Sequence, residues 1–258
     1  MNSILGFSRR RTDGINQSPK LPALINWIGY LIITLLIALP LAVLLVRSGA
    51  WQQGLLLYAI CCLGATALLA LCVLLLMLPR YSAWRGNILR RAALALPGTL
   101  LLSALLTGSG DHPRIHDITT DTEDPPVFTA AAQRRGDRAN SLEISQDTVK
   151  QQRAAYPDLD TLLVNVTIEN AFDHALQVAT ALGWEVYHQD RNAGVIEAVD
   201  TTAIMRFQDD IVIRVRSNAG GTLVDLRSVS RVGVGDLGAN AARIRDFQEA
   251  FSQAVNQR

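Results

Sequence analysis

The stretch Phe207–Phe247, FQDDIVIRVRSNAGGTLVDLRSVSRVGVGDLGANAARIRDF, decides the fold of the C-terminal part of the chain. Residues 211–216 alternate apolar and polar side chains after an apolar start, which is the period of a half-buried strand. The paired glycines 220 and 221 predict a hairpin, because tight turns need positive φ angles. Residues 224–228 then form a second expected strand, with charges on one face only.

Both expected strands therefore carry a charged face. If their register brings the two faces together, the charged side chains form a cross-strand cluster. Its expected members are Arg214, Arg216, Asp225 and Arg227, joined by Glu197 from an earlier strand. Two interpretations stay open. One is a solvated face with weak ion pairs, which commonly contribute about 0–1 kcal/mol, and the other is an anion-binding surface.

A glycine-rich elbow, residues 228–240, follows the second strand. Its glycines at 233, 235 and 238 match the Gly-x-Gly-x-x-Gly pattern of dinucleotide-binding loops. That pattern needs a parallel strand-helix-strand unit and an acidic residue about 20 residues further on, whereas only a helix follows here. We therefore expect a sharp reversal in which Asp236 caps the next helix.

Several short motifs together carry a family resemblance. They are Asp209-Asp210, Ile213-Arg214-Val215, residues 224–233 (VDLRSVSRVG), residues 236–240 (DLGAN), Arg243-Ile244-Arg245, Tyr156-Pro157-Asp158, Gly183-Trp184, Ile196-Glu197-Ala198, and residues 115–121 (IHDITTD) followed by Pro125-Pro126. The chain resembles, over roughly its last 145 residues, the family catalogued as domain of unknown function 1499. The resemblance implies a bacterial protein of a kind that is often membrane-anchored, and it implies no catalytic or binding residues.

Apolar residues are concentrated in the first part of the chain. The whole chain is 49% hydrophobic with a mean hydropathy of +0.20. Residues 24–46 and 54–78 are uncharged apolar runs, and each exceeds the about 20 helical residues that cross a bilayer. The sequence therefore predicts at least two membrane spans.

A third span is expected at residues 88–106. Arginines lie at its start and Pro97-Gly98 in its middle, but arginines snorkel to the interface and membrane helices tolerate proline. Three spans are preferred over two. We expect a tail at residues 1–23 and a membrane domain at residues 24–106.

Positive charge flanks these spans unevenly. Lys and Arg precede the first span at 9, 10, 11 and 20, occur once in the next loop at 47, and recur before the third span at 80, 85, 90 and 91. The positive-inside rule then places the amino terminus and the second loop in the cytoplasm. With three spans, everything after about Thr107 lies outside. We expect a bacterial inner-membrane protein with a cytoplasmic N-terminus and a periplasmic C-terminal domain.

The formal net charge of the chain changes from positive to negative at the end of the third expected span. Up to Leu106, nine Lys and Arg against one acidic residue give +8, and fifteen against twenty-two afterwards give −7. A mildly acidic domain is a poor nucleic-acid binder. The expected partners are the membrane and an unidentified envelope ligand or protein, and no nucleic acid.

The cysteines at 61, 62 and 72 all lie in the second expected span, where we expect them to serve as packing residues.

Residues 107–155 are rich in Asp, Thr, Pro and Arg and lack apolar periodicity, which predicts an extended linker. Within it, residues 146–155 are expected to form a short helix, and the resemblance implies that residues 115–121 pack on the domain.

His112 and His116 have the spacing of two helical metal ligands. The intervening Pro113 disfavours a helix there, so they are weak candidates, and we expect no metal and no cofactor.

Residues 156–258 predict one small α+β domain. A strand at 162–167 precedes a helix at 168–182 with one apolar face. A hairpin at 184–198, residues 202–207, the two strands of the opening stretch and a last helix at 237–255 follow. The expected order is β-α-β-β-β-β-α, in which a mainly antiparallel sheet carries both helices on one face.

No catalytic constellation stands out, and we name no catalytic residue. The preferred hypothesis is a ligand- or partner-binding module. Its candidate residues are Glu197, Arg214, Arg216, Asp225, Arg227, Arg231 and Asn240. It predicts that replacing Arg214 and Arg227 with alanine abolishes capture while the domain stays folded.

The alternative hypothesis is an envelope hydrolase. It would use the carboxylates of Asp209, Asp210 and Asp236, with His116 as a further candidate. A polar pair such as Asp209-Asp210 between two strands is more typical of a turn. The alternative requires these groups to converge in one pocket.

Overall fold

The computed structural model describes residues 20–108, 110 and 112–256. The chain divides into two compact units. The first comprises the described residues up to Leu39 together with Ala59–Leu102, and the second comprises Pro40–Tyr58 together with the described residues from Ser103 onward, which include the whole α+β fold. Nearly all of the expected tail at residues 1–23, including its three arginines, lies outside the described residues.

In the described part of the chain, three helical segments are long and apolar enough to cross a membrane. They contain α1 (Ala23–Arg47), α2 (Trp51–Met77) and α3 (Arg85–Gly108), with the 3-10 helix η1 (Pro79–Trp84) before α3. Pro97 lies inside α3 without ending it. The preference for three candidate spans over two is therefore confirmed.

The apolar helices contact one another through small and branched residues. Ile28 of α1 and Ala95 of α3 are buried in the same cluster as Cys72 of α2. Gly98 lies so near α2 that an added Cβ would be 2.6 Å from the Cβ of Ala65. Small residues permit this close approach of helix backbones.

The α+β unit is built on an antiparallel sheet of six strands in the order β1-β6-β5-β4-β3, with β2 also paired to β6. The strands are β1 (Asp117–Thr119), β2 (Leu162–Val164), β3 (Glu185–Asp190), β4 (Val195–Thr201), β5 (Gln208–Asn218) and β6 (Gly221–Ser230). β5 and β6 form the hairpin expected from the paired glycines, with Arg214 opposite Asp225. Residues 202–207 connect β4 to β5.

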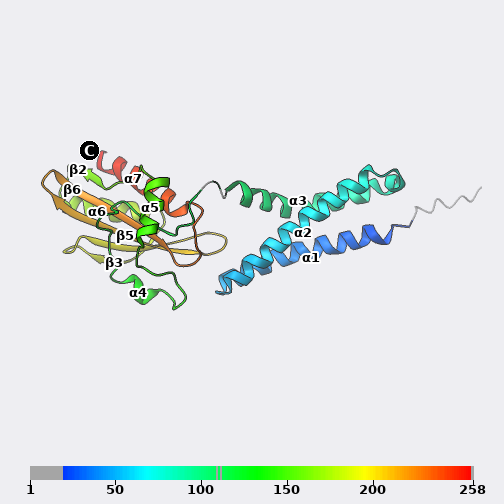
Figure 1. Ribbon diagram of the computed structural model, residues 1–258, viewed down its shortest axis with the longest axis horizontal. Helices are drawn as coiled ribbons and strands as arrows, with labels where there is room; N and C mark the ends of the chain where they lie inside the picture. Colours follow the sequence, from blue (N-terminus) through cyan, green and yellow to red (C-terminus); the bar gives the residue numbers. More distant parts are fainter. Residues whose placement is uncertain (1–19, 109, 111, 257–258) are drawn as a thin grey trace, which may run out of the picture. The chain divides into compact units, whose positions relative to one another are not determined.

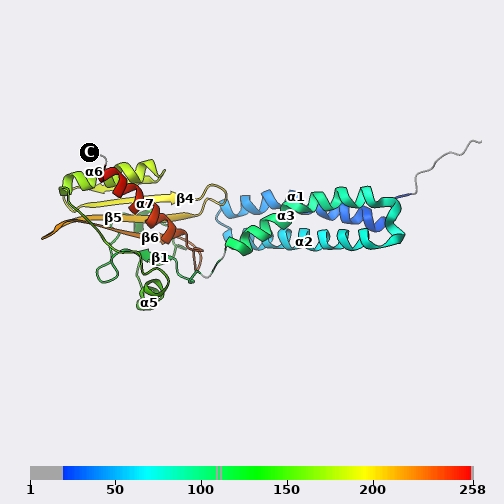
Figure 2. The same cartoon turned by 90° about the horizontal axis from the view of Figure 1, so that it is seen from above.

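Two long helices cover one face of the sheet, as Figures 1 and 2 show. They are α6 (Ile168–Ala181) and α7 (Ala239–Asn256). Phe172 of α6 and Phe247 of α7 are buried in one core with Ile211 and Leu226 of the sheet. The expected order of elements and the placement of both helices on one face are confirmed for residues 156–256.

The expected linker differs from the structure over much of its length. It contains β1, the short helix α4 (Ala131–Arg134) and α5 (Gln146–Ala155), the last at its expected bounds. Ile115 and Ile118 belong to the main core. Phe128 packs on Val212 and Val229, on the face of the sheet opposite α6 and α7. The apolar residues of this segment are few and irregularly spaced, so no helical or strand period reveals that they cover a sheet.

Candidate ligand-binding site

The pleat of the sheet distributes the candidate residues over two faces, because successive side chains of a strand point to opposite sides. Ile211, Ile213 and Val215 of β5 face the helices. Arg214 and Arg216 of the same strand lie on the opposite face, which we call the polar face.

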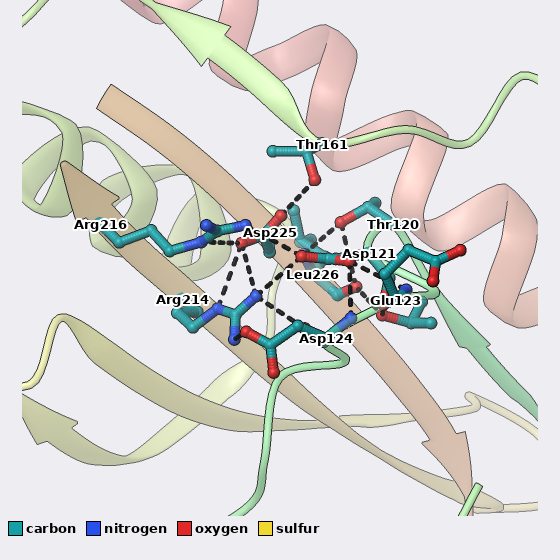
Figure 3. Close-up of polar contacts among 10 residues, drawn as sticks. Thr120, Asp121, Glu123, Asp124, Thr161, Arg214, Arg216, Asp225 and Leu226 are labelled. Carbon is teal, nitrogen blue, oxygen red and sulfur yellow. Dashed lines mark hydrogen bonds and ion pairs between the residues drawn. The ribbon is translucent and has the colours of Figure 1, made fainter. Parts of the chain in front are cut away.

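One ion-pair cluster on the polar face centres on Asp225 (Figure 3). Arg214 donates to Asp225 Oδ2 from Nε at 3.2 Å and from Nη2 at 3.0 Å, and Arg216 Nε donates to the same oxygen at 3.0 Å. Asp121 Oδ2 accepts from Nη2 of both arginines, at 3.1 and 2.9 Å. Asp124 Oδ2 accepts from Arg214 Nη1 at 2.9 Å. This Asp225 cluster confirms the expected cross-strand contact for three of its members.

The Asp225 cluster holds three carboxylates against two guanidinium groups. Asp225 is fully buried, and its hydrogen bond to Arg216 raises the pKa of that arginine. Arg216 is more exposed than Arg214, with 39% of its side chain accessible. The side chain of Asp124 is 75% accessible. Only this outer flank of the cluster is open to a ligand.

Arg227 lies on the same face but belongs to a different pair. Its Nε and Nη2 donate to Asp117 Oδ1 and Oδ2 at 2.9 and 2.7 Å. It also donates to the carbonyl oxygens of Pro126 at 3.2 Å and Leu142 at 2.6 Å. Both charged side chains are 4% exposed, so Arg227 fastens the upstream segment to the sheet and presents no free surface.

Glu197 is likewise occupied from within the domain. Its carboxylate accepts hydrogen bonds from the backbone N–H groups of Thr129, Ala130 and Ala131 at 2.5 to 3.1 Å, where α4 begins. The hydroxyl of Tyr187 donates to Glu197 Oε2 at 3.3 Å. Burial, with the negative charges of Asp210 and Glu197, raises the pKa of Tyr187 far above its usual range. Glu197 therefore does not meet Arg214 or Arg216.

Arg231 and Asp210 form a further ion pair on the polar face, separate from the Asp225 cluster and from the Arg227–Asp117 pair. Its Nε and Nη2 donate to Asp210 Oδ2 and Oδ1 at 2.9 and 2.7 Å, and this bidentate contact raises the pKa of the arginine. Arg135 Nε lies 3.2 Å from Asp210 Oδ2. The Arg135 side chain is buried, which lowers its pKa. Asp210 is thus shared by two guanidinium groups.

Asn240 belongs to a network on the helix face. Its Nδ2 donates to Ser230 Oγ at 2.9 Å and to the carbonyl oxygen of His116 at 3.1 Å, and Ser228 Oγ donates to its Oδ1 at 2.6 Å. Arg243 Nη1 donates to the same Oδ1 at 2.6 Å. This residue links β6 to α7 and lies across the sheet from the Asp225 cluster.

The three aspartates of the hydrolase hypothesis do not converge. Asp209 accepts from Arg243 at 2.6 Å on the helix face, whereas Asp210 pairs with Arg231 on the polar face. Asp236 caps α7 as expected, accepting from the backbone N–H of Asn240 at 2.6 Å. Adjacent residues of β5 face opposite sides of the sheet, so no pocket holds all three carboxylates.

The two candidate histidines have other contacts. His112 Nδ1 lies 3.2 Å from the hydroxyl of Tyr156, and the backbone oxygen of His116 accepts from Ser230 N at 2.9 Å. Across the described residues, no group of three or more His, Cys, Asp or Glu side chains is arranged to hold a metal ion. Asp111, next to His112 in the sequence, lies outside the described residues.

A concavity of about 320 Å³ opens on the helix side of the domain. It is lined by Leu182, Trp184, Asp200, Ala239, Ala242, Arg243 and Asp246. Asp200 Oδ2 accepts from Arg243 Nε at 2.9 Å, and 32% of the Asp200 side chain is accessible. The indole of Trp184 stacks on Phe247, with 5.6 Å between ring centroids. The concavity therefore combines an aromatic wall with charged groups of both signs.

Comparison with protein families matches residues 117–251, from the first residue of β1 into the last turns of α7, to the family described as protein of unknown function, DUF1499. The chain belongs to this family. The resemblance inferred from the sequence is confirmed. No curated protein matches the chain. The DUF1499 match begins at β1, which agrees with the inclusion of the upstream segment in the sheet.

Sequence reasoning missed several charged residues of the DUF1499 domain. Asp117, Asp121 and Asp124 hold Arg227 and Arg214, yet they lie 90 or more residues upstream in what was expected to be a linker. The acidic composition of residues 121–124 is the signal that could have found Asp121 and Asp124, because an arginine-rich face requires carboxylate partners. The concavity beside Trp184 has no such local signal, since its walls come from the connection between α6 and β3, from β4 and from α7.

Proposed function

We propose that this protein is a bacterial inner-membrane protein whose DUF1499 domain lies in the periplasm and binds a small ligand. Three candidate spans, an odd number, support opposite sides for the amino terminus and the domain. The arginines before and after the second span support a cytoplasmic amino terminus, since Arg47 is alone in its loop and four arginines precede or open the third span.

The observation that carries the ligand-binding role is the concavity beside Trp184. Asp246 is exposed at its rim, and Asp200 retains accessible surface although it contacts Arg243. Ligand sites in proteins are concave and combine apolar walls with a few placed polar groups. The concavity meets that description within the domain.

The charged groups in and around the concavity indicate the class of ligand. Arg243 is fully engaged, because it donates to Asp200, Asp209, Ser228 and Asn240. Asp200 and Asp209 both accept from this guanidinium, and Asp246 also lines the concavity, so carboxylates outnumber the guanidinium and leave an excess of negative charge. Carboxylates and an aromatic ring are the groups that bind an organic ammonium. The proposed ligand is therefore an amine-bearing molecule.

Tryptophan fluorescence tests this role directly. The sequence has four tryptophans, at 27, 51, 84 and 184, so replacing the first three with phenylalanine leaves Trp184 as the reporter beside the concavity. Titrating the purified full-length protein with ethanolamine or spermidine is expected to change Trp184 emission with a saturable profile. Sodium acetate is the probe of opposite charge and is expected to give no saturable change.

Two variants of α7 sharpen the test. Asp246→Asn removes a carboxylate that lines the concavity, and Glu249→Gln removes an exposed carboxylate of the same helix that does not line it. Amine binding is expected to weaken at least several-fold in Asp246→Asn and to be unchanged in Glu249→Gln. Equal binding by both variants would exclude the concavity as the site.

The exposed flank of the Asp225 cluster supports a second candidate function, the capture of a protein partner. Arg216 and Asp124 keep substantial exposed surface there. Arg216→Ala removes an exposed guanidinium and is the suitable variant, because Arg227 is buried in its own ion pair. A protein that co-purifies with the wild type and is lost from Arg216→Ala, but retained by Arg191→Ala at an exposed pair with Asp173, would favour partner capture.

A further inference from the structure

Two loops lie together at one end of the sheet. Residues 202–207 join β4 to β5, and residues 231–238 join β6 to α7. Their bases are adjacent, because Thr201 pairs with Gln208 and the backbone N–H of Arg231 donates to the Gln208 carbonyl at 3.0 Å. We call this the loop end of the domain.

Exposed apolar side chains gather at the loop end. Ile204 is 67% exposed, Val234 65% and Leu237 54%. Single exposed hydrophobic residues are normal on a soluble surface. Three on two loops with adjacent bases are the kind of exposed apolar surface that marks a protein or membrane interaction site.

A candidate membrane span ends only a few residues before the part of the chain that contacts the loop end. The candidate span that includes α3 runs to Thr107, and Ile115 is already in the core of the domain. His112 lies beside the elbow, since a Cβ added to Gly238 would be 2.7 Å from the His112 ring. Five residue steps from Thr107 to His112 cover at most about 18 Å. The loop end therefore lies within a few residues of the end of a candidate membrane span.

Basic side chains lie around the apolar ones. Arg114, Arg138 and Arg206 are exposed. Arg114 adjoins the elbow at Gly235, where an added Cβ would be 3.1 Å from the Arg114 Cα. Asn140, which follows Arg138 closely, donates to the Gly233 carbonyl at 2.8 Å. Apolar residues flanked by arginines match the interfacial zone of a bilayer that contains anionic lipid.

Acidic neighbours do not cancel this pattern. Asp137 is the exposed acidic residue between Gly136 and Arg138. Asp236 accepts from the backbone N–H groups of Gly238 and Asn240 at 3.0 and 2.6 Å, so its charge is directed to the start of α7. Three exposed arginines therefore outnumber the free carboxylates of the loop end.

From these observations we propose that the loop end is a lipid-binding surface. The side chains of Ile204, Val234 and Leu237 enter the headgroup region of the adjacent leaflet, and Arg114, Arg138 and Arg206 contact lipid phosphates. This contact holds the DUF1499 domain on the bilayer in one orientation. It is independent of the amine site and of the side of the membrane on which the domain lies.

Spin labels on the full-length protein measure this contact. Cys61, Cys62 and Cys72 are replaced with alanine, and single cysteines are introduced at 204, 234 and 237, with a control at Leu163. Leu163 is 58% exposed and pairs with Leu223, near the opposite end of β6. The protein is placed in vesicles of phosphatidylethanolamine and phosphatidylglycerol, and collision rates with oxygen and with a water-soluble nickel chelate are compared.

Labels at 204, 234 and 237 are expected to give an oxygen-to-nickel collision ratio several-fold above that of the Leu163 control. A ratio equal to the control at all three positions would overturn the proposal. Strong spin–spin broadening at these positions would also overturn it, because that result identifies a second copy of the chain as the covering partner.

A second variant separates lipid contact from folding. Leu237 has a φ of 56°, a conformation that costs energy for a residue with a Cβ atom and little for glycine. Leu237→Gly therefore removes the apolar side chain without adding strain. The ratios at 204 and 234 are expected to fall in this variant while the circular dichroism spectrum is unchanged; unchanged ratios would argue against insertion by the loop end.

Discussion

Arg227 of β6 and Asp117 of β1 are 110 residues apart in the chain and form a buried bidentate ion pair, with nitrogen–oxygen distances of 2.9 and 2.7 Å. The same guanidinium donates to the carbonyl oxygens of Pro126 and Leu142. One side chain of the sheet thus holds three points of the upstream segment. Most of the charged side chains predicted for this face therefore form ion pairs that join the sheet to the upstream segment covering it.

Arg227→Ala is expected to destabilise the domain by about 3–5 kcal/mol, because it leaves the buried Asp117 carboxylate without its cation. This expectation replaces the view that Arg227 could be removed without affecting the fold. Urea unfolding of the single-tryptophan protein, followed by Trp184 emission, measures the change. Arg191→Ala is the control, since its pair with Asp173 is exposed and contributes about 0–1 kcal/mol. Equal stability of the two variants would contradict a structural role for Arg227.

Glu197→Ala is expected to release the segment around α4. The backbone N–H groups of Thr129, Ala130 and Ala131 lose their acceptor, and hydrogen bonds to a charged group contribute about 1.5–3 kcal/mol each. Trypsin should then cut faster at Arg134 and Arg135, which follow these residues. Glu197→Gln keeps an acceptor oxygen and should show intermediate protection. Cleavage at the wild-type rate in Glu197→Ala would show that other contacts hold this segment.

The raised pKa of Tyr187 is expected to lower the free energy of unfolding at alkaline pH. Burial and the charges of Asp210 and Glu197 raise its pKa in the folded domain, so the folded state keeps the phenol proton that the unfolded state releases near pH 10. The stability from this effect is complete below about pH 10 and falls as the pH rises further. Tyr187→Phe should flatten the pH dependence of unfolding above pH 10. An unaltered dependence in that variant would assign the effect to other groups.

Gly194→Ala is expected to disrupt the turn between β3 and β4. Gly194 has a φ of 67°, and an added Cβ would lie 2.0 Å from the Val215 carbonyl oxygen. The left-handed conformation costs alanine about 1–2 kcal/mol, and overpacking adds about 1–3 kcal/mol. Gly136→Ala is the matched control, because nothing lies within 4 Å of its added Cβ. Thermal unfolding of the two variants compares them, and similar melting temperatures would be inconsistent with this close approach.

Local patterns were sufficient for the elements and for their broad arrangement. The uncharged runs at 24–46 and 54–78 predicted two of the helices, because crossing a bilayer requires a long apolar segment whatever its neighbours are. Alternation in β5 and the glycines at 220 and 221 predicted the β5–β6 hairpin. Asp236 was recognised as the cap of α7 because capping depends on residues only a few positions away.

The location of β5 shows how a local error changed a functional expectation. The strand begins at Gln208 and therefore includes Asp209 and Asp210, which had been interpreted as a turn or as paired carboxylates. Once both residues belong to a strand, the two-residue period alone sends them to opposite faces. The convergence of carboxylates that the hydrolase alternative requires is therefore absent for Asp209 and Asp210.

The sequence by itself determined the apolar helices, the order of elements in residues 156–256 and the family, because each of these is encoded in neighbouring residues. Only the tertiary structure decided which charges pair. Arg214 meets Asp121, 93 residues away, and Asp200, Trp184 and Asp246 meet at one concavity from separate elements. Such contacts depend on how distant segments pack across a sheet, and no periodicity within either segment records its partner.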